Sequence, residues 1–143
     1  MIHQVAEVVD ADRRTEANEA YFRNSVYGEG NREFVMGYYF WLIVGEGRNY
    51  LVDTGYSEGA ASRRGRDFIV TPVEAVRAFG LEPSSVDRVF LSHLHYDHTG
   101  NVRGFPNADA TLDSLEYDFW TTGHGRKQML WASAEQDDLD YLG

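Results

Sequence analysis

The stretch Ser92-His93-Leu94-His95-Tyr96-Asp97-His98-Thr99-Gly100 decides how this chain is to be understood. It holds three of the five histidines of the protein within six residues. Imidazole and carboxylate groups are the side chains that bind zinc and similar divalent ions at neutral pH. Gathering four of them in one short loop costs loop-closure entropy only once. The stretch therefore predicts a metal site whose ligands are His93, His95, Asp97 and His98.

The spacing of these ligands favours two ions rather than one. In an extended segment His93 and His95 project to the same side, so both can reach a first ion. Asp97 and His98 come one turn later and cannot easily reach that ion from the opposite wall. We expect them to hold a second ion, about 3.5–4 Å from the first, so that both activate one shared hydroxide. Asp97 would then also be catalytic, orienting and moving a proton. A chance cluster of core histidines is the alternative, but such residues need no spacing of this kind.

Two motifs together resemble a known family. The pattern His-x-His-x-Asp-His, entered from the apolar segment 86–91, resembles the signature of the metallo-β-lactamase superfamily. The segment Tyr50-Leu51-Val52-Asp53-Thr54-Gly55 resembles the strand and Asp-Thr-Gly turn that precede the metal loop in that superfamily. The aromatic stretch 38–43 and the segment 116–120 are most similar to the N-acyl homoserine lactonase branch. The resemblance covers residues 34–141.

This resemblance implies a metal-dependent hydrolase with an αβ/βα layered sandwich fold, of which this chain supplies the N-terminal half. It implies two divalent ions, with zinc as the expected metal, and a small-molecule substrate whose lactone ring is opened by a metal-bridging hydroxide. It also places Asp53 close beneath the metals, where we expect the carboxylate to brace a ligand imidazole and fix its tautomer. The alternatives are another metallohydrolase, such as a glyoxalase II-like thioesterase, and a truncated, non-catalytic metal-binding module.

The number of ligands is the reason for expecting only half of a domain. A catalytic zinc takes three protein ligands plus water, so two ions need about six protein contacts, and the stretch offers four side chains. The resemblance implies that the missing ligands lie beyond Gly143. His124 and His3 are the remaining histidines. We interpret His124 as part of a helix linker and His3 as a surface residue of the N-terminal segment.

Composition narrows the class of protein further. The net charge of −10 argues against nucleic-acid binding, because contact with phosphates needs a basic face. The longest apolar stretch, 34–44, is too short to span a membrane. The N-terminus lacks the basic start and apolar run of a signal peptide, so a cytoplasmic location is expected. If only half of the layered domain is present, an apolar face of the sheet stays uncovered. Such a face would favour the formation of a homodimer.

The chain is predicted to form one partial domain over residues 1–143. We expect an irregular segment over 1–33, with a short strand at 5–9 within it. A hairpin (34–44 and 50–53), a helix opened by Thr71 and Pro72 and closed by Gly80, a strand at 86–91 and the metal loop should fill residues 34–104. A short helix should begin at Thr99. Residues 105–143 are predicted to be a helical insertion, with a strand at 110–112 and a helix that begins at 113. Its apolar positions are expected to pack in the core; they are Phe119, Trp120, Met129, Leu130, Trp131, Leu139 and Tyr141. The arginines at 63, 64 and 66 are interpreted as a solvated loop.

Overall fold

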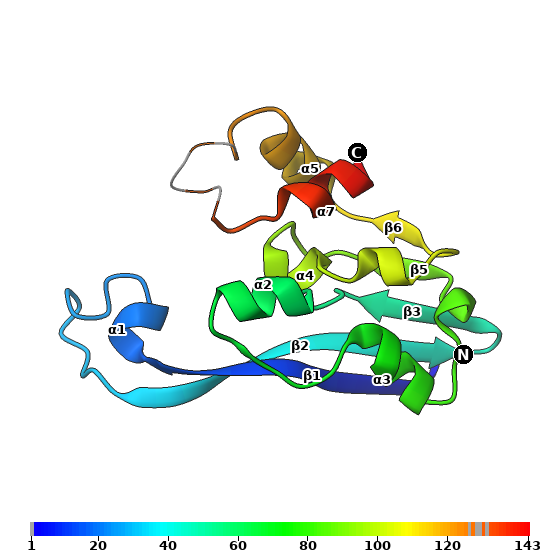
Figure 1. Ribbon diagram of the computed structural model, residues 1–143, viewed down its shortest axis with the longest axis horizontal. Helices are drawn as coiled ribbons and strands as arrows, with labels where there is room; N and C mark the ends of the chain where they lie inside the picture. The colour runs from blue at the N-terminus through cyan, green and yellow to red at the C-terminus, as the bar shows by residue number, and fades with distance from the viewer. Residues whose placement is uncertain (1, 126, 128–129, 131) are drawn as a thin grey trace.

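A six-stranded mixed sheet forms the body of the protein in the computed structural model, with helices on one side of it (Figure 1). The structure describes residues 2–125, 127, 130 and 132–143. The strand order across the sheet is β4-β1-β2-β3-β5-β6. The strands are β1 (Ile2–Glu16), β2 (Glu33–Gly45), β3 (Arg48–Val52), β4 (Asp67–Phe68), β5 (Arg88–Phe90) and β6 (Asp109–Thr111). The predicted α/β class is confirmed.

Short helices connect the strands. The α-helices are α1 (Ala17–Ala20), α2 (Glu58–Arg63), α3 (Pro72–Ala78), α4 (Tyr96–Thr99), α5 (Ser114–Thr121) and α7 (Gln136–Leu142). Two 3-10 helices, η1 (Pro83–Ser85) and η2 (Val102–Gly104), lie in the connections on either side of β5. Helices α2, α3 and α4 lie in front of the sheet, and α5 and α7 lie beside β6 (Figure 1). No helix among the described residues is long and apolar enough to cross a membrane.

The sheet has an antiparallel half and a parallel half. Strands β1, β2 and β3 are antiparallel neighbours, while β3, β5 and β6 run parallel. Parallel strands end at the same edge of a sheet, so the segments that follow β3 and β5 must lie side by side. Asp53 follows β3 and the metal loop follows β5. The topology thus brings the two motifs of the sequence to one edge.

The predicted irregular N-terminal segment is wrong over residues 10–16. Strand β1 continues to Glu16 because β2 offers it a partner over its whole length, up to the pair Glu16 and Glu33. The pairing register shifts between Val9 and Ala11, which leaves Asp10 in a bulge. Residues 10–16 are polar, and their composition did not predict a strand. Strands β1 and β2 form a long two-stranded ribbon, which extends past the other strands in Figure 1.

Two other local predictions are confirmed. Strands β2 and β3 form the expected hairpin, although Gly45 already pairs with Arg48, so that only Glu46 and Gly47 make the turn. Gly47 has a φ of 68°, which glycine adopts without the steric penalty of a side chain. Helix α3 has the expected capping box between Thr71 and Glu74, with Pro72 in its first turn.

The two faces of the sheet differ in burial. The face toward the helices carries the core, where Phe40, Leu42, Leu51 and Val89 pack with Val76 of α3. The opposite face is apolar but partly open to solvent, with Val5 59% exposed and Phe90 37% exposed. This open face matches the expected uncovered sheet. Exposed apolar surface of this kind favours association with another layer of protein.

The predicted helical insertion is only partly helical. Helix α5 begins where expected, with the Asp113 side chain accepting a hydrogen bond from Leu115 N at 2.8 Å. It ends at Thr121, the described residues 122–125 form turns and a bend, and α7 spans Gln136–Leu142. Of the aromatic and aliphatic positions expected to pack there, Trp120 and Leu139 are buried, while Tyr141 is 49% exposed. The predicted apolar positions Met129 and Trp131 lie outside the described residues.

Candidate metal centre

The candidate centre lies at the carboxyl edge of the parallel strands. His93 and His95 lie in the loop after β5, and Asp97 and His98 lie on α4. The prediction that a helix begins at Thr99 is wrong, because α4 begins at Tyr96 and Thr99 is its last residue. Asp97 is therefore in the first turn of α4, the end of a helix that favours a negative charge.

Asp53 lies under this loop, at the end of β3. The residue is 1% exposed and its φ is 63°, in the left-handed region that aspartate tolerates better than most residues. Its carboxylate accepts hydrogen bonds from Ser92 N at 2.7 Å and from Ser92 Oγ at 2.8 Å. It also lies 2.8 Å from Nδ1 of His98. The structure therefore places Asp53 against one of the predicted ligands.

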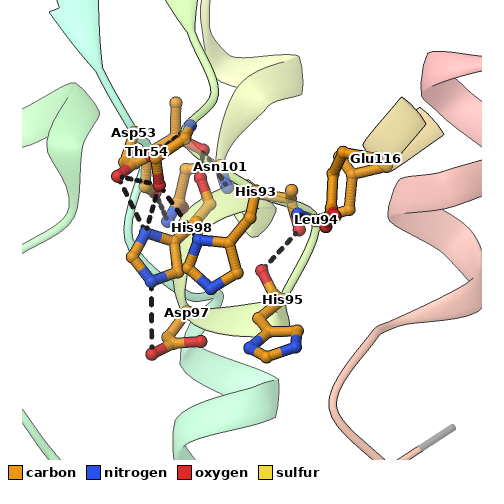
Figure 2. A network of polar contacts seen from close by, with 11 residues as sticks. Asp53, Thr54, His93, Leu94, His95, Asp97, His98, Asn101 and Glu116 are labelled. Carbon is orange, nitrogen blue, oxygen red and sulfur yellow. Dashed lines mark hydrogen bonds and ion pairs between the residues drawn. The ribbon is translucent and has the colours of Figure 1, made fainter. Parts of the chain in front are cut away.

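The four predicted ligands lie close together (Figure 2). Nδ1 of His98 faces Asp53, and Nε2 lies 3.5 Å from an oxygen of Asp97. The ring centroid of His93 lies 4.0 Å from that of His98 and 4.5 Å from that of His95. The His93 ring thus lies between those of His95 and His98, and Asp97 lies next to His98.

The pKa values of these groups reflect their mutual contacts. Burial lowers the pKa of His98, but hydrogen bonds to Asp53 and Asp97 outweigh burial and raise the pKa to about 9. Burial raises the pKa of Asp97, but the hydrogen bond and charge of His98 outweigh it and bring the pKa below its usual range. Burial, followed by the charges of His98 and His95, lowers the pKa of His93. The carboxylates Asp53 and Asp97 thus supply negative charge on both sides of His98.

The donor set fits a divalent ion in its chemistry, because imidazole and carboxylate are ligands that zinc accepts. Within residues 2–125, 127, 130 and 132–143, no group of three or more such side chains is arranged to hold one ion. His124 is exposed, and its ring is stacked on Phe119 at a centroid distance of 6.5 Å. His3 lies within β1.

The Asp-Thr-Gly turn also holds the backbone of α4 in place. Thr54 donates to the carbonyl oxygen of His98 from N at 2.8 Å and from Oγ1 at 2.9 Å. The side-chain amide of Asn101 donates back to the carbonyl oxygens of Thr54, at 2.9 Å, and Tyr56, at 3.0 Å. Sequence analysis missed Thr54 and Asn101 as supporting residues, although Thr54 lies inside one quoted motif and Asn101 directly follows the other.

Glu116 supports the metal loop from the other side, and sequence analysis missed this as well. Its carboxylate accepts hydrogen bonds from Leu94 N at 2.9 Å and from Nε1 of Trp120 at 2.7 Å. The indole of Trp120 lies edge-on to the His95 ring, with centroids 5.6 Å apart. Helix α5 thus holds the loop between His93 and His95, which no local pattern in the sequence could indicate.

The expectation of a solvated arginine loop is wrong for Arg64. Its guanidinium stacks over the Tyr96 ring, 3.8 Å from the centroid, and it forms an ion pair with Glu135. Arg63 pairs with the same carboxylate at 3.0 Å. The backbone N–H of Tyr96 donates to Ser133 O at 2.8 Å. Residues 133–135, before α7, are therefore held against α4. The planar guanidinium of Arg64 can stack on an aromatic ring and form an ion pair at the same time.

A second buried carboxyl group lies behind the Asp-Thr-Gly turn. Asp10 is fully buried, and neither of its carboxyl oxygens has a well-formed hydrogen bond within the described part of the chain. One of these oxygens lies 2.1 Å from the position that a Cβ at Gly55 would take. Burial raises the pKa of Asp10 to about 6, and the nearby backbone amides of Asp10 and Tyr56 offset only part of this effect.

We expect Asp10→Asn to make the protein more stable than the wild type at pH 7.5, with the advantage shrinking as the pH falls to 4. Because the pKa of Asp10 is raised in the folded protein, Asp10 loses its proton at a lower pH in the unfolded chain than in the folded one. As the pH rises from 4 to about 6, the wild type therefore loses stability, by up to about 3 kcal/mol for a pKa shift of about two pH units. Urea unfolding of both proteins across this pH range measures the difference.

Asp12→Asn is the matched control, because it makes the same charge change at a partly exposed position of β1. Its stability difference from the wild type should vary little with pH. A constant difference for Asp10→Asn as well would contradict the predicted cost of ionising Asp10.

The fold and the donor set define an α/β protein with a metal-ligand loop at the carboxyl edge of its parallel strands. The family model described as "Metallo-beta-lactamase superfamily" matches residues 35–141, so the chain belongs to this superfamily. Curated relatives include the N-acyl homoserine lactonase AttM of Azorhizobium caulinodans, 36% identical over 81 residues, which are 48% of this chain and 31% of the relative. AttM of Rhizobium radiobacter is 33% identical over 104 residues, 60% of this chain and 40% of the relative. The resemblance to the superfamily and to the lactonase branch is confirmed.

Solved structures share the fold. A quorum-quenching N-acyl homoserine lactone lactonase superposes with a TM-score of 0.70 at 19% identity, covering 96% of this chain and 53% of that one. The dizinc quorum-quenching lactonase AidC, in complex with a product, gives a TM-score of 0.61 at 20% identity, covering 81% of this chain and 43% of that one. The chain thus spans about half the length of these structures and a smaller share of the curated relatives.

Proposed function

We propose that this protein is part of a metal-dependent hydrolase that opens the lactone ring of an N-acyl homoserine lactone or a closely related ester. The observation that carries the proposal is the gathering of His93, His95, Asp97 and His98 at one sheet edge, with Asp53 bonded to His98. The superfamily match and the lactonases among the relatives support the choice of reaction and of substrate.

The proposal assigns the ligands to two divalent ions, with zinc as the metal. His93 and His95, whose rings are neighbours, would hold one ion, and Asp97 and His98 would hold the other. The hydrogen bond from Nδ1 of His98 to Asp53 would leave Nε2 as the ligand atom and fix the tautomer. Ser92, held by both oxygens of Asp53, keeps that carboxylate in place.

When bound, such ions acidify water to give hydroxide near neutral pH and polarise the carbonyl group under attack. The residues of the chain supply the rest. The Asp97 carboxylate stands beside Nε2 of His98 and is ionised at neutral pH, so it can accept a proton from the attacking water. The same group can pass that proton to the alkoxide that leaves when the ring opens.

We expect Asp97→Asn to lower kcat/KM for an acylated lactone by about 100-fold or more, while the free energy of unfolding changes little. The substitution removes a charge and a proton acceptor but keeps the volume of the side chain. Lactone turnover by the zinc-loaded whole hydrolase, of which this chain is proposed to be part, and urea unfolding measure the two effects. Elemental analysis should find two zinc ions per chain in that whole wild-type protein.

Asp109→Asn is the control, because Asp109 is exposed and is the first residue of β6, beside the start of β5 and not the metal loop that follows its end. It should leave both turnover and zinc content unchanged. A thioester and a β-lactam belong in the same assay, and preference for the thioester would favour the glyoxalase II-like alternative. If Asp97→Asn lowers the rate and the stability equally, Asp97 is a structural residue.

The pairing of two copies of the protein stays a prediction, which analytical sedimentation would test.

A further inference from the structure

A pocket opens beside the candidate metal ligands, on the part of β2 that extends beyond β3. The last residue of β3, Val52, pairs with Trp41, so the residues of β2 before Trp41 have no partner in β3. The pocket lies there and has a volume of about 260 Å³. Asp97 and His98 line one side, and the rest of the lining belongs to β2, with Met36, Gly37, Tyr38, Tyr39 and Trp41.

The aromatic wall of this pocket is held in place by its neighbours. The Tyr39 ring lies across Gly37, where a Cβ would meet the ring and hydroxyl atoms at 2.6–2.9 Å. Nε1 of Trp41 donates to Glu7 of β1 at 3.3 Å. Gly37 is thus the position that allows the Tyr39 ring to lie flat over the strand. A side chain at residue 37 would move that ring and change the shape of the pocket.

The lining indicates what kind of group the pocket accepts. Asp97 and His98 are the charged residues among those that line it, and both belong to the candidate metal centre. The β2 side offers a thioether, three aromatic rings and the bare backbone of Gly37. Such a surface favours an uncharged, apolar group. Its volume is below the 300–1,000 Å³ or so that a whole drug-sized ligand occupies, so it suits one part of a substrate.

We propose that this pocket on β2 binds the acyl chain of the substrate, while the lactone carbonyl faces Asp97 and His98. Gly37 and Tyr39 determine which chain lengths are accepted, because the position of the Tyr39 ring sets the depth of the pocket. The inference rests on the proposed function, and it names the residues that select among acylated lactones.

Calorimetric titration with a non-hydrolysable series of 3-acylaminopyrrolidin-2-ones, lactams with butanoyl, hexanoyl and octanoyl chains, tests this assignment. A buried methylene contributes a factor of about four in affinity at most. We expect the wild type to bind the hexanoyl lactam more tightly than the butanoyl one, by about two- to fourfold per methylene, and to gain little from the octanoyl chain, because the Tyr39 ring limits the depth of the pocket. Gly37→Val should reduce this factor to about one, because the valine displaces the Tyr39 ring. Tyr39→Ala, which widens the pocket, should move the preference to the octanoyl chain.

Tyr50→Ala is the matched control, because Tyr50 is an aromatic residue of β3 outside the pocket, in ring contact with Phe90. It should keep the wild-type dependence on chain length. Valine is favoured in strands, so Gly37→Val should not disturb β2 itself. If Gly37→Val and Tyr39→Ala both bind the series as the wild type does, the assignment of the pocket is overturned.

Hydrolysis of the matching acyl lactones separates this inference from the proposed function. If Gly37→Val abolishes and Tyr39→Ala shifts the chain-length dependence of lactam binding, while no lactone is hydrolysed, the pocket is supported and the hydrolase is refuted. Hydrolysis at the same rate for every chain length, in wild type and variants alike, would support the hydrolase and overturn the pocket.

Discussion

Gly100→Ala should lower the free energy of unfolding by about 3 kcal/mol or more. Gly100 follows α4 with a φ of −64°, a conformation in which alanine is normally favourable. The obstacle is space, because a Cβ there would lie 2.2 Å from Ser57 N and 2.6 Å from Tyr56 Cα. Backbone atoms cannot rotate away as a side chain can. The end of α4 would have to separate from the Asp-Thr-Gly turn. This would break the hydrogen bond that Gly100 N donates to Gly55 O at 2.9 Å.

Urea unfolding measures this loss, and zinc titration should show weaker binding because α4 carries Asp97 and His98. Gly59→Ala is the control, since the nearest atom to its Cβ is Nη1 of Arg63, at 3.3 Å, and that side chain can move. An alanine in α2 should stabilise the protein by up to about 1 kcal/mol. Equal stability of Gly100→Ala and the wild type would contradict the close approach of α4 to residues 56 and 57.

Asp53→Ala should destabilise the protein by about 3–5 kcal/mol, because it leaves buried partners of a charged group unpaired. Ser92 N, Ser92 Oγ and Nδ1 of His98 all lose the carboxylate that they contact. Asp53→Asn should cost far less stability, since asparagine keeps the volume and tolerates the positive φ. Its amide N–H groups would face Nδ1 of His98, which favours the tautomer protonated at Nε2. Zinc affinity should therefore fall about 10- to 100-fold in Asp53→Asn.

Comparing unfolding and zinc titration for both variants separates the two roles of Asp53. Asp87→Ala is the control, because Asp87 also accepts a hydrogen bond from a backbone amide, Asn49 N at 2.7 Å, but directly precedes β5, at the opposite end of that strand from the metal loop. It should cost about 1 kcal/mol and leave zinc affinity unchanged. If Asp53→Asn bound zinc as tightly as the wild type, the proposed control of the His98 tautomer would be wrong.

Local patterns in the sequence predicted much of this protein. The hairpin, the capping box at Thr71, the start of α5 and the α/β class all depend on neighbouring residues, and the structure has them. The His-x-His-x-Asp-His run could be identified because all four ligands lie within six residues. The same approach was wrong for residues 10–16, where pairing with β2 determines the strand and composition does not.

Contacts between distant segments were decided by the tertiary structure alone. Glu116 reaches Leu94, Arg64 reaches Tyr96 and Glu135, and the bulge at Asp10 places a buried carboxyl group against Gly55. The sequence by itself determined which side chains can bind a metal, because donor chemistry and short spacing are local properties. Which groups hold those side chains, and what surface lies beside them, depends on strand register and helix packing, which join residues far apart in the chain.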